Sequence, residues 1–162
     1  MQKVRALMTH SQVEFSALNI NMIIEDVLKL TQSDLIIKNI LVSKQFEKNL
    51  PALKGDRIQL QQVFLNLIIN ATDSMHESKV RELLISTAKQ DGGFVIVCVR
   101  DSGTGFDEKD KEELFVPFFT TKKEGMGMGL SVVKTIVKSH GGNVWVENNE
   151  KSGASFFVRF NI

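Results

Sequence analysis

The sequence predicts an α+β fold in which about three helices cover one face of a mostly antiparallel sheet of about five strands. Three segments carry apolar residues at the spacing of an amphipathic helix, and five shorter runs have the composition of strands. Glycine-containing turns separate neighbouring strand-like runs in two places, which favours antiparallel pairing. The helical segments are 19–37, 57–75 and 130–139, and the strand-like runs are 40–46, 83–88, 94–100, 143–148 and 154–161.

The first helix is predicted from Asn19 to about Ile37, and a strand follows over 40–46. Asn19 or Asn21 can cap this helix, because an asparagine side chain accepts a hydrogen bond from the free amides of the first turn. Residues 1–8 also look helical but are too few to be stable alone, so we interpret 1–11 as the end of a longer helix. The apolar positions of the first helix are Ile20, Ile23, Ile24, Val27, Leu28 and Leu30.

The second helix is predicted from Arg57 to about Met75. Pro51 marks a break before it, and Gly55 and Asp56 supply a turn and an N-cap. The inner side of this helix carries Leu60, Val63, Phe64, Leu67, Ile68 and Ala71.

The second half of the chain is predicted to form two hairpins around one helix. Residues 91–93 (DGG) join the runs 83–88 and 94–100, and the turn 150–153 separates the last two strands. The helix over 130–139 ends at a His-Gly-Gly sequence whose glycine supplies a left-handed cap. Residues 102–128 are polar and rich in glycine, and such a long irregular stretch is usually functional or mobile.

Composition indicates one soluble domain of 162 residues, 43% of them hydrophobic. A net charge of +1 gives no electrostatic reason to expect nucleic acid or an anionic membrane as a partner. No run approaches the ~18 apolar residues of a membrane-spanning helix, and the N-terminus lacks the apolar stretch of a signal peptide. The single cysteine, Cys98, excludes an internal disulfide and is interpreted as a buried small hydrophobe in a cytoplasmic protein.

Two glycine-rich runs indicate a phosphate-binding site. Residues 125–131 (GMGMGLS) open the third helix, where unpaired backbone amides and the helix dipole both favour negative charge. Residues 101–105 (DSGTG) place one carboxylate in a tight turn, which suits reading the flat polar edge of a ligand. Glycine-rich turns are weak signals singly, but two in this order behind an asparagine-rich helix are much stronger.

The second helix carries Gln62, Asn66 and Asn70 at intervals of four residues, so the three amides stack on one face. A row of amides either faces solvent or holds a polar ligand, and alone it is more often a solvated stripe. Asparagine carbonyl oxygens are hard ligands that suit a Mg²⁺ ion bridging nucleotide phosphates.

Four segments resemble, in order and spacing, the sequence boxes of the sensor histidine kinases, and the similarity covers about 12–162. They are 62–71 (QVFLNLIINA) for the N box, 101–105 for the first glycine box, 114–122 (LFVPFFTTK) for the phenylalanine box and 125–131 for the second glycine box. The resemblance implies a Bergerat-type two-layer sandwich of the GHKL superfamily, with ATP and Mg²⁺ held between the N-box helix and a lid at about 106–128. It also identifies 1–11 as a remnant of the dimerisation helix.

The resemblance implies a role for each matching residue. Asp101 accepts a hydrogen bond from the adenine amino group, which selects adenine over guanine, and Ser155 assists it. Asn66 and Asn70 position Mg²⁺, and Lys122 is a lid cation near the outermost phosphate. Phe115, Phe118 and Phe119 anchor the lid, and backbone amides of Gly127, Gly129 and Leu130 hold the phosphates. The nucleotide pocket further includes Asp73, Gly103, Gly105, Gly125 and Met128.

The implied reaction is transfer of the γ-phosphoryl group to a histidine rather than hydrolysis. ATP-hydrolysing relatives carry a glutamate where this chain has Asn66, and an amide cannot act as a general base. None of His10, His76 and His140 lies in a convincing acceptor sequence, so each is expected to be a surface or capping residue.

The implied partners are the protein's own dimerisation domain and a cognate response regulator. The chain itself is expected to be monomeric, and its parent protein a homodimer that can be membrane-anchored. Two alternatives remain open: a serine/threonine protein kinase of the anti-sigma-factor type, and a nucleotide-sensing module that only docks partners.

Overall fold

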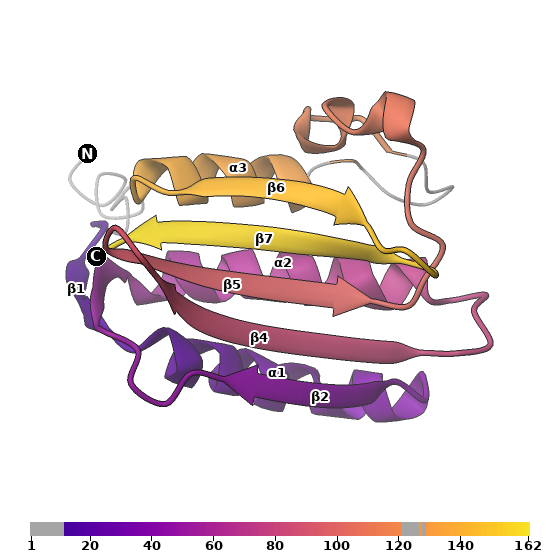
Figure 1. Ribbon diagram of the computed structural model, residues 1–162, viewed down its shortest axis with the longest axis horizontal. Coiled ribbons are helices and arrows are strands. Elements are labelled where there is room, and N and C mark those ends of the chain that lie inside the picture. Colours follow the sequence, from indigo (N-terminus) through magenta and orange to yellow (C-terminus); the bar gives the residue numbers. More distant parts are fainter. Residues whose placement is uncertain (1–11, 121–126, 128) are drawn as a thin grey trace, which may run out of the picture.

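The structure is a computed structural model that describes residues 12–120, 127 and 129–162. The expected α+β architecture is confirmed: within these residues, three helices cover one face of a five-stranded sheet (Figure 1). The predicted helix over the first residues of the chain lies outside the described part.

The five-stranded sheet has the order β2-β4-β5-β7-β6. Strand β2 runs parallel to β4, and every other neighbouring pair is antiparallel. Both predicted hairpins are therefore present, as β4–β5 and β6–β7. The bounds of the strands are Leu41–Phe46 (β2), Glu82–Gln90 (β4), Phe94–Asp101 (β5), Asn143–Asn148 (β6) and Ala154–Asn161 (β7).

The first two of the three helices begin after a side chain that accepts a hydrogen bond from a free amide of the first turn. Helix α1 (Ile20–Ile37) is capped by Asn19, whose side chain accepts from the amide of Asn21. Helix α2 (Arg57–Ser74) is capped by Asp56, which accepts from the amide of Gln59. Helix α3 (Gly129–Ser139) begins inside the second glycine-rich run. The apolar faces of the helices and one face of the sheet form a continuous core.

A small two-stranded sheet was not predicted. Strands β1 (Phe15–Leu18) and β3 (Leu53–Asp56) pair antiparallel beside the main sheet. Only Leu18 of β1 is buried, so its sequence lacks the alternation that would identify a strand. Gly55, expected in a turn, lies inside β3. Glycine is needed there because a Cβ would lie 2.9 Å from Cδ2 of the His140 ring.

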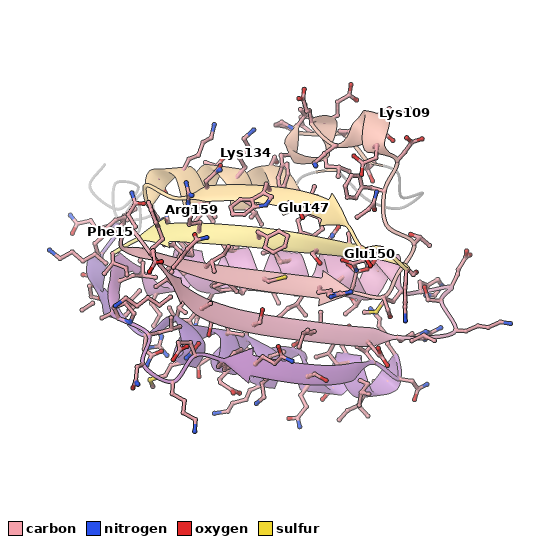
Figure 2. The ribbon with its side chains drawn as sticks, viewed as in Figure 1. Phe15, Lys109, Lys134, Glu147, Glu150 and Arg159 are labelled. Carbon is pink, nitrogen blue, oxygen red and sulfur yellow. The ribbon has the colours of Figure 1, made fainter. Side chains whose placement is uncertain are left out.

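His140 is a capping residue at the end of α3, which was one of the two expectations for the histidines, but it does not lie at the surface. Its side chain is buried at the end of α3, where Nε2 accepts from the amide of Asp56 at 3.0 Å. The other ring nitrogen, Nδ1, lies 2.8 Å from the carbonyl oxygen of Ile136. Phe15 stacks on the imidazole with 4.7 Å between ring centroids (Figure 2 labels Phe15). His140 therefore joins the small sheet to α3.

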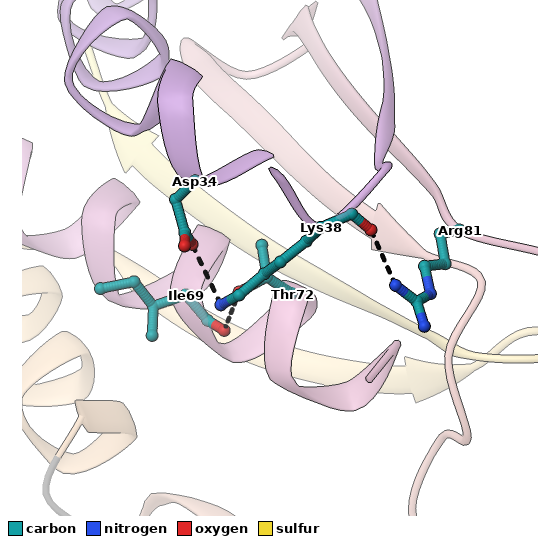
Figure 3. A network of polar contacts seen from close by, with 5 residues as sticks. All are labelled: Asp34, Lys38, Ile69, Thr72 and Arg81. Carbon is teal, nitrogen blue, oxygen red and sulfur yellow. Dashed lines mark hydrogen bonds and ion pairs between the residues drawn. The ribbon is translucent and has the colours of Figure 1, made fainter. Parts of the chain in front are cut away.

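Arg81 fixes the connection that follows the second helix. Its Nη1 donates to the carbonyl oxygen of Lys38 at 2.8 Å (Figure 3). Its Nε donates to the carbonyl oxygen of Ser78 at 3.0 Å. Lys38 in turn pairs with Asp34 through its ammonium group at 3.0 Å. The C-terminal ends of α1 and α2 are thereby held together before β4 begins.

The face of the sheet turned away from the helices carries a partly buried apolar cluster. Trp145 stacks on Phe157 with 5.3 Å between centroids, and the thiol of Cys98 lies opposite Phe157 across the β5–β7 pair. Cys98 is thus half-buried on this open face, not in the core as predicted. Burial nevertheless raises the pKa of the Cys98 thiol, against the lowering effects of the Ser155 hydrogen bond and the nearby Arg100 charge.

None of the helices in the described ranges is both long and apolar enough to cross a bilayer.

Candidate functional site

The amide row of α2 faces the beginning of α3. Asn66 and Asn70 are half-buried, whereas Gln62 is exposed. The Nδ2 group of Asn66 donates to the carbonyl oxygen of Gly129 at 3.2 Å. The structure therefore brings the second helix and the second glycine run together, although they are far apart in the sequence.

Asp101 ends β5 with its side chain on the helical side of the sheet. It pairs with Leu83, which faces the core, and it is 2% exposed. Its Oδ1 accepts from the amide of Gly103 at 2.8 Å and lies 3.4 Å from the amide of Ala154. Two backbone donors hold one carboxylate oxygen, so the orientation of the carboxylate is set by the fold before any ligand arrives.

The first glycine run packs directly onto the end of α2. A side chain at Gly103 would place its Cβ 2.5 Å from the backbone oxygen of Ser74, so only glycine fits. The amide of Thr104 also donates to that oxygen at 3.2 Å. Asp101 and the asparagine helix are thus fixed relative to each other by main-chain contacts.

The beginning of the predicted lid contains two 3-10 turns, Glu108–Asp110 and Glu113–Phe115. Phe115 is buried, packs edge-on against Phe156 at 6.2 Å, and has the Lys134 ammonium 5.9 Å from its ring centroid. Phe115 therefore packs this segment against β7 and α3. Phe119 is half-buried, but Phe118 is 73% exposed and does not act as an anchor here.

The middle of the lid region and its C-terminal end are joined by a hydrogen bond. The amide of Phe118 donates to the carbonyl oxygen of Gly127 at 3.0 Å. The phenylalanine box and the second glycine box are therefore neighbours in space. Gly129 and Leu130 form the first turn of α3, whose amides have no acceptor within the helix. The other candidates in this region, Lys122, Gly125 and Met128, lie outside the described residues.

The structure does not bring Ser155 together with Asp101. Ser155 pairs with Arg100, and its hydroxyl lies on the open face of the sheet beside Cys98. There it donates to the Oδ1 atom of Asn149 at 2.6 Å. Strand alternation places Ala154, not Ser155, on the Asp101 side, so the expected assistance from this hydroxyl is corrected.

Sequence reasoning missed the polar residues of the β6–β7 turn. Asn148, Asn149 and Ser152 donate to backbone oxygens of the Asp101 loop or of the chain just after it. In the sequence they looked only like the connection of a hairpin. Asparagine and serine are the common residues of such connections, so composition gave no separate signal for this role.

A hollow of about 590 Å³ lies at the same end of the sheet and is lined in part by Asp101 and Ser102. Its other lining residues include Arg100 and Leu84, which point to the open face. Neither the asparagines of α2 nor the glycines of α3 line it. A ligand that contacts Asp101, Asn66 and Gly129 together must therefore lie on the helical side of the sheet.

The oxygen donors that Asn66 and Asn70 offer a metal ion are neutral amide oxygens. Among residues 12–120, 127 and 129–162, no group of three or more histidine, cysteine, aspartate or glutamate side chains could hold an ion. The amides of Asn66 and Asn70 fit a hard cation that keeps most of its other ligands, such as Mg²⁺ accompanied by phosphates and water.

Known proteins with similar sequences belong to a family of ATPases. Residues 55–162 match the family described as histidine kinase-, DNA gyrase B-, and HSP90-like ATPases. The sensor protein FixL of Bradyrhizobium diazoefficiens is 32% identical over 156 residues, which are 96% of this chain and 31% of that protein. The chain thus spans about a third of the length of this relative.

Solved structures give the same result. The catalytic domain of the histidine kinase ThkA has a TM-score of 0.82 and 33% identity, covering 91% of this chain and 95% of that one. ThkA in complex with the response regulator protein TrrA has a TM-score of 0.79 and 29% identity, covering 98% and 46%. With its paired glycine runs, asparagine helix and buried aspartate in one site, the chain belongs to this ATPase family as the ATP-binding catalytic domain of a sensor histidine kinase.

Proposed function

We propose that this domain transfers the γ-phosphoryl group of Mg²⁺-bound ATP to a histidine on a dimerisation domain, from which a response regulator receives it. The contact between Asn66 and Gly129 carries the proposal, because it joins the metal-positioning helix to the phosphate-binding turn. With Asp101 fixed on the same side of the sheet, one nucleotide can reach all three elements.

Different residues of the site bind different parts of the nucleotide. Asp101 accepts a hydrogen bond from the adenine amino group, since an ionised carboxylate only accepts and guanine presents a carbonyl there. Backbone amides of Gly127, Gly129 and Leu130 bind phosphate oxygens at the positive end of α3. The buried Phe115 side chain anchors the lid to the core. Of the remaining pocket residues, we keep Asp73, Gly103, Gly105, Gly125, Lys122 and Met128 as candidates.

Mg²⁺ would be held by Asn66 and Asn70 only in company with the nucleotide. Two neutral amide oxygens form a weak site for a divalent ion, whereas phosphates supply the charge that Mg²⁺ requires. When bound, the ion neutralises charge on the phosphates. The chain's part is to position it relative to the amides of α3.

The residues of this domain form no covalent bond with the phosphoryl group during the transfer. A histidine ring nitrogen attacks the γ-phosphorus, the bond to the bridging oxygen breaks, and ADP leaves with that electron pair. Positioning and charge stabilisation therefore account for most of the catalysis. Asp73 is the one carboxylate on α2 and lies near its end, so Asn66 has no acidic neighbour on the preceding turns to activate water. This composition supports transfer over hydrolysis.

In this proposal the acceptor histidine belongs to a dimerisation domain that is absent from this sequence. His140 is buried with both ring nitrogens engaged, and His76 follows the end of α2 without an acceptor-type sequence. The ThkA–TrrA complex supports a response regulator as the final partner, by similarity of the domains.

The decisive experiment mixes this domain with separately expressed dimerisation helices of the same kinase and radiolabelled ATP. We expect label on the helices that is acid-labile and base-stable, which is the behaviour of phosphohistidine. Acid-stable label would indicate a serine or threonine acceptor instead. ATP binding without any transfer would leave only the nucleotide-sensing function, and equal binding of GTP would contradict the role of Asp101.

A further inference from the structure

Two consecutive asparagines at the end of β6, Asn148 and Asn149, hold the two ends of the first glycine loop, residues 101–106. Asn149 donates through Nδ2 to the carbonyl oxygen of Asp101 at 2.8 Å. Asn148 contacts Phe106, the residue at which the chain leaves the loop for the lid. In Figure 1 the β6–β7 turn lies beside the segment that rises from β5 to the 3-10 turns, and Figure 2 labels Glu147 and Glu150 on either side of the pair.

The side chain of Asn148 binds Phe106 as a neighbouring strand would. Its Oδ1 accepts from the Phe106 amide at 3.0 Å, and its Nδ2 donates to the Phe106 carbonyl oxygen at 2.8 Å. The same Nδ2 lies 3.2 Å from a carboxylate oxygen of Glu108, inside the first 3-10 turn. These three contacts use both donors and the acceptor of the amide, so its orientation is determined.

Asn148 lies so close to the loop that residue 105 must be glycine. The φ of Gly105, +71°, is a backbone conformation that favours glycine, and a Cβ there would lie 2.5 Å from Oδ1 of Asn148. The second glycine of the DSGTG run therefore makes room for the Asn148 side chain. A ligand contact is not needed to explain this glycine.

Asn149 is held just as firmly. Its Nδ2 also donates to the carbonyl oxygen of Ser152 at 3.0 Å, and its Oδ1 accepts from the Ser155 hydroxyl at 2.6 Å. The role expected of Ser155 at the adenine is thus replaced by an indirect one: it orients Asn149, which holds the backbone of Asp101.

We propose that Asn148 is a positioning residue for nucleotide binding, which fixes the start of the lid at a set distance from the base-reading Asp101. Asn149 holds one end of the loop and Asn148 the other, and the two are the residue after β6 and the last residue of β6. The proposal rests on the nucleotide site proposed above. Asn148 and Asn149 together hold the chain between the part of the site that reads the base and the part that covers the phosphates.

The test combines nucleotide affinity with local hydrogen exchange. Asn148→Ala removes three hydrogen bonds from an exposed side chain, so we expect ADP·Mg²⁺ to bind about tenfold more weakly by calorimetry. Amide exchange should accelerate over 104–110, whereas the midpoint of urea unfolding should change little. Asn161→Ala is the matched control, because exposed Asn161 also donates to a backbone oxygen, that of Gly141 at 3.2 Å, at the opposite end of β7.

Asn148→Asp adds a readout that a merely structural role would not move. At neutral pH its carboxylate faces the Phe106 oxygen and Glu108, so binding should be weaker than in Asn148→Ala. As the pH falls toward the ordinary aspartate pKa of about 3.9, the carboxyl becomes protonated and regains one donor, so the deficit relative to wild type at the same pH should shrink.

The outcomes separate the two proposals. Failure of the wild type to bind ADP·Mg²⁺ would refute the nucleotide site itself. Wild-type binding with Asn148→Ala within about twofold of it, and unchanged exchange over 104–110, would overturn the positioning role alone. A loss of affinity equal to that of Asn161→Ala would do the same.

Discussion

At the scale of single residues, Asp101 is the side chain whose geometry is best defined by its surroundings. The amides of Gly103 and Ala154 converge on one of its oxygens, and its 2% exposure keeps bulk water away. Polar contacts at such a buried position are worth more than on the surface, because the alternative is an unsatisfied group. Small changes in its chemistry should therefore have large effects.

Asp101→Asn tests this directly. The new amide can present a donor to the adenine amino group, which is itself a donor, so the affinity for ADP should fall by about a hundredfold or more. Isothermal titration calorimetry measures the change, with Asp91→Asn in the β4–β5 turn as the control. Equal affinities for the wild type and Asp101→Asn would show that another residue reads the base.

Cys98 offers a residue-scale prediction on pH. Burial raises the pKa of its thiol, so the folded protein holds the proton to higher pH than the unfolded chain, whose reference value is 9.0. Alkylation by iodoacetamide should thus be slower in the folded protein than in urea at any pH near neutrality. Stability should also decline as the pH rises above about 9, since the unfolded state then releases the proton first. Equal alkylation rates would contradict the raised pKa.

At the scale of elements, α2 serves both the core and the site. Its inner side packs against the sheet, while Asn66 contacts the beginning of α3. The helix can hold this position only if its first turn is fixed, and Asp56 does this by accepting from the amides of Gln59 at 2.9 Å and Glu14 at 3.0 Å.

Asp56→Ala should therefore lower the free energy of unfolding by about 2 kcal/mol, because it removes an N-cap and the anchor of Glu14 together. Urea denaturation gives the value. Asp34→Ala, which removes only an exposed i,i+4 pair with Lys38, should change stability by less than about 0.5 kcal/mol. Similar losses in the two variants would argue against the capping role.

The elements also show what can be predicted from sequence. The helices and the strands of the main sheet were predictable because long periodic runs such as that of α1 carry a strong signal. Strand β1 was not, since only Leu18 is buried and the pairing partner of the strand lies far along the chain. The resemblance identified Asp101 and Asn66, but which face of β7 carries Ser155 depended on the register with β5. Asn148 and Asn149 became visible only through their contacts.

At the scale of the whole molecule, His140 links parts that are distant in sequence. It contacts β3 through the amide of Asp56, β1 through stacking with Phe15, and its own helix through Ile136. Strand β1 is thus packed against the end of α3, the helix whose beginning is the proposed phosphate site.

A double-mutant cycle measures this link. His140→Ala should cost about 2–3 kcal/mol of stability, because it leaves the buried amide of Asp56 without its acceptor. Phe15→Ala should cost less, and the two changes should be non-additive by about 0.5–1.5 kcal/mol owing to the lost stacking. Additive effects in urea unfolding would show that the stacked pair makes no energetic contribution.

The stack of Trp145 on Phe157 has a practical consequence. Trp145 is the sole tryptophan of the chain, and it lies on the face of the sheet opposite the helices. Its fluorescence should change when the sheet melts and stay constant during a nucleotide titration, which occurs on the other side. The fluorescence of Trp145 therefore reports folding alone, so a variant that no longer binds ADP in calorimetry can be checked separately for an intact sheet.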